Sequence, residues 1–280
     1  MGYYEFTITV ADASRDALMQ GVHAIGCLGI VEREGGLVVY FSDTLGIDRI
    51  RKELDSFIAV LGASGLDPAV TYTCIFLSER DWNESWKKKF RPIDVGDRFS
   101  ILPPWEQGVA GRVTIIIDPG MAFGTGHHET TRTCLLYIDR FSKQVRKGRF
   151  LDVGTGTGIL AIAASLLGFG QVVGVDIDPL AVDAAERNVR LNQAANVLIK
   201  EGSIDSVEGT YDFIAANLLS EILIRLAPDL SVRLEPGSIA MLSGMIAGQE
   251  EEVKAVMERQ GLKTVETFVD GRWVTVIMTK

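Results

Sequence analysis

The stretch LDVGTGTGILAIAA, residues 151–164, places three glycines between an apolar run and a series of helix-forming residues. RFLDV reads as a strand and ILAIAASLLG as a helix, so Gly154, Gly156 and Gly158 are predicted to lie in a strand-to-helix turn. Glycines in such a turn remove side chains and let a ligand approach the backbone and the helix N-terminus closely. In doubly wound α/β sheets this crevice binds nucleotides.

The spacing of these glycines separates two classes of nucleotide site. A dinucleotide-binding fingerprint has glycine at positions 1, 3 and 6, but position 6 counted from Gly154 is Ile159 and the third glycine stands at position 5. A nicotinamide-dependent dehydrogenase is therefore disfavoured. The Gly-x-Gly-x-Gly pattern, with Asp152 two positions before it, resembles motif I of the Rossmann-like S-adenosylmethionine methyltransferases.

An acidic residue stands at the end of the next predicted strand, QVVGVDI. A carboxylate at this position, Asp176, can accept hydrogen bonds from both hydroxyls of a ribose. Helix capping is the other common role of an acidic residue here, and Asp178 fills it better because a proline follows it. Ile177 is expected to line the adenine face, and Ser203, in the loop EGSID, to reach the adenine edge.

Strand-like and helix-like segments alternate from about residue 100 onward. Repeated βα units predict a parallel sheet with helices on both faces. The last stretch, TVETFVDGRWVTVIMTK, reads as a hairpin around Asp270 and Gly271, so at least one edge of the sheet is expected to be antiparallel. The predicted fold class is α/β, with a Rossmann-like, doubly wound methyltransferase domain over residues 101–280.

Residues 1–78 read as a small domain of their own. The predicted order is a strand, a helix, two strands joined around Gly35 and Gly36, an amphipathic helix and a final strand. This βαββαβ order is that of a ferredoxin-like α+β domain. Nothing in the segment suggests catalysis.

Residues 79–100 differ in character from both neighbours. Trp82, Trp86 and Phe90 recur at a spacing that puts them on one face of a helix, and Lys87–Lys89 are interleaved with them. We predict a linker helix that docks its aromatic stripe on a neighbouring domain. Contact of this basic and aromatic segment with RNA is the alternative.

Composition and charge restrict the class of partner. Apolar residues make up 47% of the chain and the net charge is −9, which is globular composition with an acidic balance. Such a surface repels phosphate backbones, so direct nucleic-acid binding is disfavoured and a basic protein partner is favoured, unless the charge serves solubility alone.

The expected location follows from the apolar runs, the N-terminus and the cysteines, and a monomer is the default expectation for assembly. No apolar run is long enough for a membrane span, and the N-terminus lacks a secretory signal. The three scattered cysteines suit free thiols in a reducing compartment. A cytoplasmic monomer is expected.

Two further stretches make the resemblance specific. They are DPGMAFGTGHHETTRTCL, residues 118–135, and AANLLSEIL, residues 215–223. With the glycine turn and GVDIDPLAV, they closely resemble the ribosomal protein L-eleven methyltransferase (PrmA) family. The resemblance implies an N-terminal domain that recognises the basic ribosomal protein and a linker helix that reorients it. It also implies a C-terminal domain that methylates lysine side chains and the N-terminal α-amine. S-adenosyl-L-methionine is then the methyl donor and leaves as S-adenosylhomocysteine.

The resemblance also implies the site residues. The cofactor contacts carried over are Thr131, Gly154, Asp176 and Asn217, and the predicted cofactor site adds Asp152, Gly156, Gly158, Ile177 and Ser203. A loop over the methionine end and the reactive amine would comprise Phe123, Gly124, Thr125 and Gly126. The predicted catalytic residues are Asn217, Leu218, Phe123 and Thr125.

Asn217 ends the predicted strand YDFIAAN at the carboxyl edge of the sheet. Its side-chain carbonyl can accept one N–H of an amine and turn the lone pair toward the methyl group, while Leu218 and Leu219 shape an apolar slot. This is similar to the Asn/Asp-Pro-Pro-Tyr arrangement of other amine methyltransferases, without the prolines and tyrosine, so a more open slot for several targets is expected. A turn or helix cap before LLSEIL is the alternative role of Asn217.

His127, His128 and Glu129 stand where many members of the family have Thr-His-Pro. Paired histidines can indicate a metal, but the sequence offers no third ligand, so no metal site is expected. Two other functions stay open. The first is methylation of another protein or a small amine, and the second is a binding module without chemistry, against which the intact Asp176 and Asn217 argue.

Overall fold

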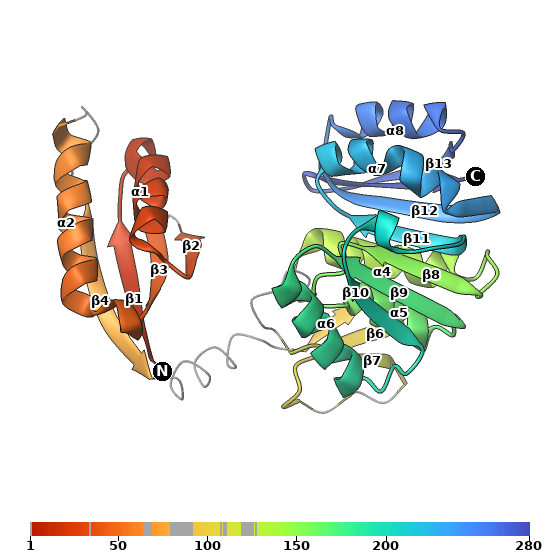
Figure 1. The fold of residues 1–280 in the computed structure, drawn as a ribbon, viewed down its shortest axis with the longest axis horizontal. Coiled ribbons are helices and arrows are strands. Elements are labelled where there is room, and N and C mark those ends of the chain that lie inside the picture. The colour runs from red at the N-terminus through yellow and green to blue at the C-terminus, as the bar shows by residue number, and fades with distance from the viewer. Residues whose placement is uncertain are drawn as a thin grey trace. The chain divides into compact units, whose positions relative to one another are not determined.

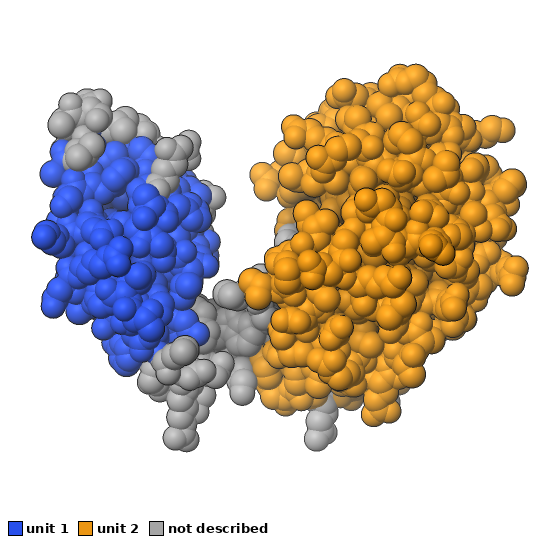
Figure 2. All heavy atoms as spheres, viewed as in Figure 1, with its two compact units in different colours: residues 1–90 blue, residues 91–280 orange. Residues whose placement is uncertain are grey.

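The computed structural model describes residues 2–33, 35–63, 69–78, 92–106, 108, 111–118, 126 and 128–280. The chain divides into two compact units, residues 1–90 and 91–280 (Figure 2). Each unit has its own hydrophobic core. Within the described ranges, none of the helices combines the length and the apolar composition that a membrane span requires.

The N-terminal unit is a four-stranded antiparallel sheet with two helices. Its elements are β1 (Gly2–Thr9), α1 (Asp12–Ile25), β2 (Gly29–Arg33), β3 (Gly36–Ser42), a 3₁₀ turn (Asp43–Leu45), α2 (Ile47–Ala63) and β4 (Thr71–Ser78), and the strand order is β2-β3-β1-β4. Phe6 of β1, Leu18 of α1 and Leu54 of α2 are fully buried in one core. The predicted ferredoxin-like arrangement is confirmed.

A seven-stranded sheet forms the centre of the C-terminal unit, in the order β10-β9-β8-β11-β12-β14-β13. The parallel strands are β8 (Arg149–Val153), β9 (Gln171–Asp176), β10 (Val197–Glu201), β11 (Tyr211–Asn217) and β12 (Leu234–Ile246). The terminal hairpin consists of β13 (Lys263–Asp270) and β14 (Trp273–Thr279), and β14 pairs antiparallel with both β12 and β13. The doubly wound fold and its antiparallel edge are confirmed.

Helices cover both faces of this sheet (Figure 1). They are α4 (Glu129–Phe141), α5 (Ile159–Leu166), α6 (Pro179–Leu191), α7 (Ser220–Val232) and α8 (Glu250–Arg259), with a 3₁₀ turn at Ile204–Ser206. Successive side chains of a strand point to opposite faces. In β11, Phe213 and Ala215 therefore enter the core with α4 and α5, whereas Ile214 and Ala216 enter the core with α7 and α8. Asn217 continues this alternation on the α4 face.

Three short strands lie outside the main sheet. They are β5 (Ile93–Val95), β6 (Phe99–Leu102) and β7 (Val113–Ile116), which pair in the order β5-β6-β7. The predicted linker helix covers residues 79–100. Residues 79–91 lie outside the described residues, but residues 93–100 are not helical, because Val95 and Phe99 are buried in the core with α4 and α5.

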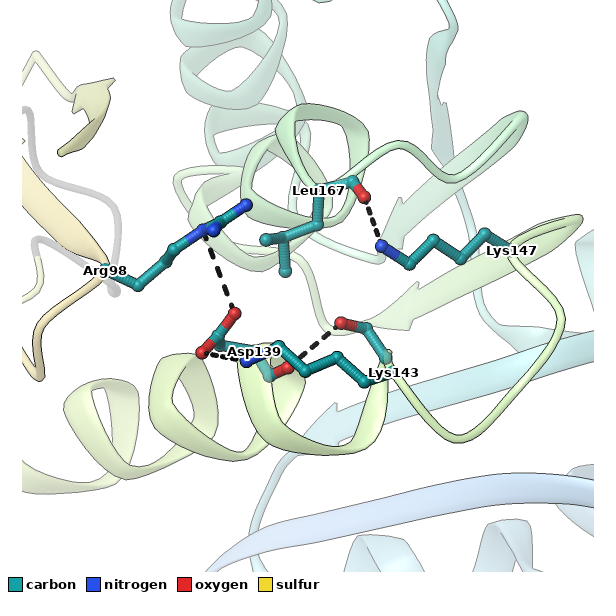
Figure 3. Close-up of polar contacts among 6 residues, drawn as sticks. Arg98, Asp139, Lys143, Lys147 and Leu167 are labelled. Carbon is teal, nitrogen blue, oxygen red and sulfur yellow. Dashed lines mark hydrogen bonds and ion pairs between the residues drawn. The ribbon is translucent and has the colours of Figure 1, made fainter. Parts of the chain in front are cut away.

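Charged side chains make polar contacts at the C-terminal ends of α4 and α5 (Figure 3). Asp139 of α4 has Lys143 Nζ 3.0 Å from Oδ2, and Arg98, from the turn between β5 and β6, has Nε 3.9 Å from Oδ1. Lys147 donates to the carbonyl of Leu167, the C-cap of α5, over 2.7 Å. A cation is favourable at a helix C-terminus, and these contacts all lie at the C-terminal ends of α4 and α5. The N-terminal ends of both helices face the carboxyl edge of the sheet.

Candidate functional site

A cavity of about 600 Å³ lies at the carboxyl edge of the seven-stranded sheet. This is where ligands bind in open parallel sheets, and the volume is that of a small-molecule site. Of the predicted cofactor residues, the cavity is lined by Gly154, Gly156, Asp176, Ile177, Ser203 and Asn217. Leu218 and Leu219 line it as well. The lining residues that the structure describes lie between residues 128 and 273.

The glycine turn is held tightly between the ends of three strands. The N–H of Gly154 donates to the carbonyl of Val175 over 2.9 Å, and the N–H of Gly156 donates to Asp176 Oδ2 over 2.9 Å. Gly154 has a φ of +73°, and a Cβ there would lie 2.5 Å from Leu218 Cδ2. The positive φ therefore favours glycine, and a side chain at this position would displace that of Leu218.

The carboxylate of Asp176 accepts hydrogen bonds from the backbone and also lines the cavity. Its Oδ2 accepts from Gly156, and its Oδ1 accepts the N–H of Asp178 over 3.1 Å. Each carboxylate oxygen has two lone pairs, so acceptor capacity remains toward the cavity. Asp178 accepts the N–H of Leu180 over 2.9 Å and is the N-cap of α6, which confirms its predicted capping role.

Two exposed aliphatic side chains line the cavity. Ile177 is 75% exposed and Leu219 is 64% exposed, and both line the cavity. Exposed apolar side chains that converge on a cavity indicate a ligand with an apolar face. Ser203 lines the same cavity immediately before the 3₁₀ turn that follows β10.

Asp152 lies beneath the glycine turn and does not line the cavity. Its side chain is 1% exposed, and its Oδ2 accepts from the Thr155 hydroxyl over 2.7 Å and from the N–H of Ala161 over 3.2 Å. Its Oδ1 has no hydrogen-bond partner among the described residues. Removal from water raises the pKa of Asp152 to about 7. This carboxyl group therefore braces the turn against α5.

Two other predicted cofactor contacts, Gly158 and Thr131, also do not line the cavity. A Cβ on Gly158 would lie 3.2 Å from Ala185 Cβ, so this glycine serves the close packing of α5 on α6. Thr131 is 1% exposed, and its hydroxyl has no partner among the described residues. Its neighbour Thr130 lines the cavity instead, because consecutive helical residues point roughly 100° apart.

The loop predicted to cover the reacting groups is outside the described residues, which leaves Phe123, Gly124 and Thr125 as predictions. His127 lies outside them too. Gly126 is described and buried, and a Cβ there would lie 2.6 Å from Ile101 Cδ1.

Asn217 lines the cavity and contacts α4 directly. Its Nδ2 donates to Thr130 Oγ1 over 3.2 Å, and the same oxygen lies 2.8 Å from His128 Nδ1. The N-cap of α7 is Leu219, with no side-chain capping bond. Asn217 is therefore not a helix cap, and its amide belongs to the cavity.

Several lining residues have no counterpart in the sequence-based prediction. Trp273, the first residue of β14, contacts the His128 ring at 4.9 Å between centroids, and the Arg272 guanidinium lies 5.0 Å above Trp273. Ile222 and Arg225 of α7 also line the cavity. No local pattern marks Trp273, because the pairing of β14 with β12 brings it to the site.

A family model described as ribosomal protein L11 methyltransferase (PrmA) matches residues 3–280. The chain belongs to the PrmA family. It is similar to the ribosomal protein L11 methyltransferase of Clostridium perfringens, with 37% identity over 257 residues, 89% of this chain and 82% of the relative. It is also similar to that of Pelobacter propionicus, with 40% identity over 245 residues, 85% of this chain and 79% of the relative.

A solved structure agrees with this membership of the PrmA family. The ribosomal protein L11 methylase from Lactobacillus delbrueckii subsp. bulgaricus matches with a TM-score of 0.63 and 32% identity, covering 68% of this chain and 99% of that chain. The family resemblance predicted from FGTGHHETT and AANLLSEIL is confirmed, and the chain is a methyltransferase of this family.

Proposed function

We propose that the chain transfers methyl groups from S-adenosylmethionine to lysine side chains and the N-terminal α-amine of ribosomal protein L11. The observation that carries the proposal is one cavity with two unlike walls. One wall holds the glycine turn bonded to Asp176, and the other holds the amide of Asn217. Membership of the PrmA family supports the choice of donor and acceptor.

The residues of the first wall fit a sulfonium nucleoside. The glycine turn presents backbone without side chains, and Asp176 offers acceptor oxygens to two ribose hydroxyls. Ile177 offers an apolar face to the adenine ring, and Ser203 offers a hydroxyl at its edge. When bound, S-adenosylmethionine supplies an electrophilic methyl group on a cationic sulfur and leaves as S-adenosylhomocysteine.

The second wall fits a neutral amine. The Asn217 carbonyl accepts one N–H of the acceptor and so orients the nitrogen lone pair. Leu218 and Leu219 surround this position with apolar surface, which disfavours the ammonium form. This matters because the reference pKa is about 10.4 for lysine and about 8 for an α-amine.

Within the part of the chain that the structure describes, no carboxylate is positioned to act as general base. Asp176 is the only carboxylic acid among the described residues that line the cavity, and Gly156 and Asp178 already donate to it. The acceptor therefore loses its proton to water before transfer, and Asn217 acts by alignment.

The proposed acceptor is a basic protein, and the net charge of −9 favours its approach. We propose that the N-terminal unit, residues 1–90, recognises the substrate protein, as the resemblance to the family implies. We expect a cytoplasmic monomer without direct nucleic-acid binding.

Transfer of tritiated methyl groups to purified ribosomal proteins tests the proposal. We expect label on L11, and label on another protein or a small amine would select the alternative acceptor. Binding of S-adenosylmethionine without transfer to any acceptor would identify a binding module. Absence of binding by calorimetry would overturn the assignment altogether.

Replacement of Asn217 by alanine distinguishes binding of the methyl donor from alignment of the amine. We expect S-adenosylmethionine to bind with a Kd within about threefold of the wild type, while kcat falls by roughly tenfold or more. Unchanged turnover would rule out the alignment role.

A further inference from the structure

We infer that Thr130 and His128 are positioning residues that fix the orientation of the Asn217 amide, so that its carbonyl oxygen is presented to the acceptor amine. The inference rests on the proposed function. It stands on two hydrogen bonds between His128 and Thr130 at the start of α4 and on one from Asn217, at the end of β11, to Thr130.

The donor and acceptor roles in these hydrogen bonds are set at the start of α4. His128 is the N-cap of this helix, and its Nδ1 accepts the backbone N–H of Thr130 over 3.3 Å. A backbone N–H can only donate. Nδ1 is therefore the ring nitrogen without a hydrogen, and any second group in hydrogen-bond contact with it must also donate.

The Thr130 hydroxyl carries this direction to Asn217. It lies 2.8 Å from Nδ1 of His128, so the hydroxyl hydrogen points at the ring. The lone pairs of Oγ1 remain, and Asn217 approaches them at 3.2 Å. An acceptor oxygen requires the NH₂ group of the amide rather than its carbonyl. The Asn217 carbonyl consequently points away from Thr130.

Gly244 leaves the space that the carbonyl occupies. A Cβ on Gly244 would lie 3.0 Å from Asn217 Oδ1 and 2.6 Å from the carbonyl oxygen of Leu218. Gly244 itself lines the cavity. The carbonyl oxygen of Asn217 thus lies beside a cavity-lining glycine, which agrees with the orientation set from α4.

The orientation decides whether the amide attracts or repels an amine. With the carbonyl toward the cavity, Asn217 accepts an N–H of the acceptor. After a flip, its NH₂ group would face that N–H, donor against donor. The flipped amide would also place a carbonyl against Oγ1, which can then donate only by giving up its bond to His128. The positioning residues therefore hold one of two amide orientations.

Substitutions of Thr130 test the hydroxyl link. Thr130→Val keeps the shape and removes the hydroxyl, whereas Thr130→Ser keeps the hydroxyl. We expect Thr130→Val to lower kcat by roughly tenfold, with the Kd of S-adenosylmethionine within about twofold of the wild type. Thr130→Ser should restore kcat to within about threefold. The matched control is Thr133→Val, a buried threonine of α4 that does not line the cavity.

Substitutions of His128 test whether its Nδ1 atom, as hydrogen-bond acceptor, orients the Thr130 hydroxyl. An asparagine oxygen stands at the same number of bonds from the backbone as Nδ1 and is among the best N-cap groups. We expect His128→Asn to keep most of the activity and His128→Ala to lose about as much kcat as Thr130→Val. An equal loss of kcat in both His128 variants would overturn the role of Nδ1 as hydrogen-bond acceptor.

Nuclear magnetic resonance gives a readout that needs no turnover. The side-chain NH₂ signals of Asn217, identified by their loss in Asn217→Asp, should shift in Thr130→Val and stay in place in Thr130→Ser. Unchanged signals and unchanged kcat in Thr130→Val would overturn the inference. A higher Kd of the donor at constant kcat would instead make Thr130 a cofactor contact and would also overturn it. An inactive wild type with shifted signals would reject the proposed function but keep the positioning geometry.

Discussion

The backbone N–H of Gly156 donates to Asp176 Oδ2 over 2.9 Å, which joins the glycine turn after β8 to the carboxyl end of β9. The two motifs are separate in sequence, and this bond makes them one wall of the cavity. The shape of the turn and the orientation of the carboxylate are therefore coupled, and a change at one should affect the other.

Replacement of Asp176 by asparagine should weaken binding of S-adenosylmethionine by at least tenfold. Both carboxylate oxygens accept a backbone N–H, from Gly156 and Asp178, and an amide would leave one of these donors facing an NH₂ group, at about 1–3 kcal/mol. Calorimetry measures the Kd. Asp178→Asn is the control, because asparagine caps a helix as well as aspartate does. A Kd for Asp176→Asn within twofold of the wild type would count against the ribose contact.

Truncation of Ile177 to alanine should raise the Kd of the donor about fivefold, because a side chain over the adenine face contributes on the order of 1 kcal/mol. The change should leave the melting temperature nearly unchanged, since Ile177 is 75% exposed. Leu180→Ala is the matched control, with a side chain that is 62% exposed and lies outside the cavity lining. Equal effects of both substitutions on Kd would contradict the assignment of Ile177.

Gly244→Ala should lower kcat by roughly tenfold or more, because the new methyl group would displace Leu218 and the Asn217 amide. Gly248→Ala is the control, because its φ is +99° against +89° for Gly244 and nothing lies within 4 Å of its Cβ position. Both changes should destabilise the protein by about 1 kcal/mol through backbone strain, which thermal unfolding measures. If Gly248→Ala reduced kcat as much, backbone strain rather than crowding would be the cause.

The buried carboxyl group of Asp152 should make stability depend on pH. Its pKa rises from 3.8 to about 7 on folding, so between these values the folded state keeps a proton that the unfolded state releases. Stability is therefore highest at acidic pH and falls as the pH rises through this window, by on the order of 4 kcal/mol in total.

Asp152→Asn removes this dependence, because an amide does not titrate in the range. Urea unfolding of both proteins at pH 5, 6.5 and 8 checks the expectation. The wild type should lose stability relative to Asp152→Asn as the pH increases. A constant difference between the two proteins would show that Asp152 is ionised in the folded state throughout.

Local sequence chemistry was sufficient for the elements and for one wall of the site. The glycine turn and the Asp178 cap follow from interactions between residues close in the chain, such as the bond from Leu180 N–H to Asp178, whereas the bond that joins Gly156 to Asp176 spans 20 positions. The spacing of apolar residues and the order of the predicted elements likewise predicted the folds of both units, because alternation of strands and helices restricts the possible sheets. The linker helix predicted over residues 79–100 was wrong in its described part, residues 93–100, because burial of Val95 and Phe99 in a distant core outweighs local preference.

The opposite wall needed the folded chain. Whether Thr130 or Thr131 reaches the cavity depends on how α4 is rotated over the sheet, and no pattern within α4 reports that rotation. Trp273 reaches His128 only because β14 inserts between β12 and β13. Hydrogen bonds across turns and caps span a few residues and can be read along the chain, whereas these contacts depend on packing between segments far apart in it.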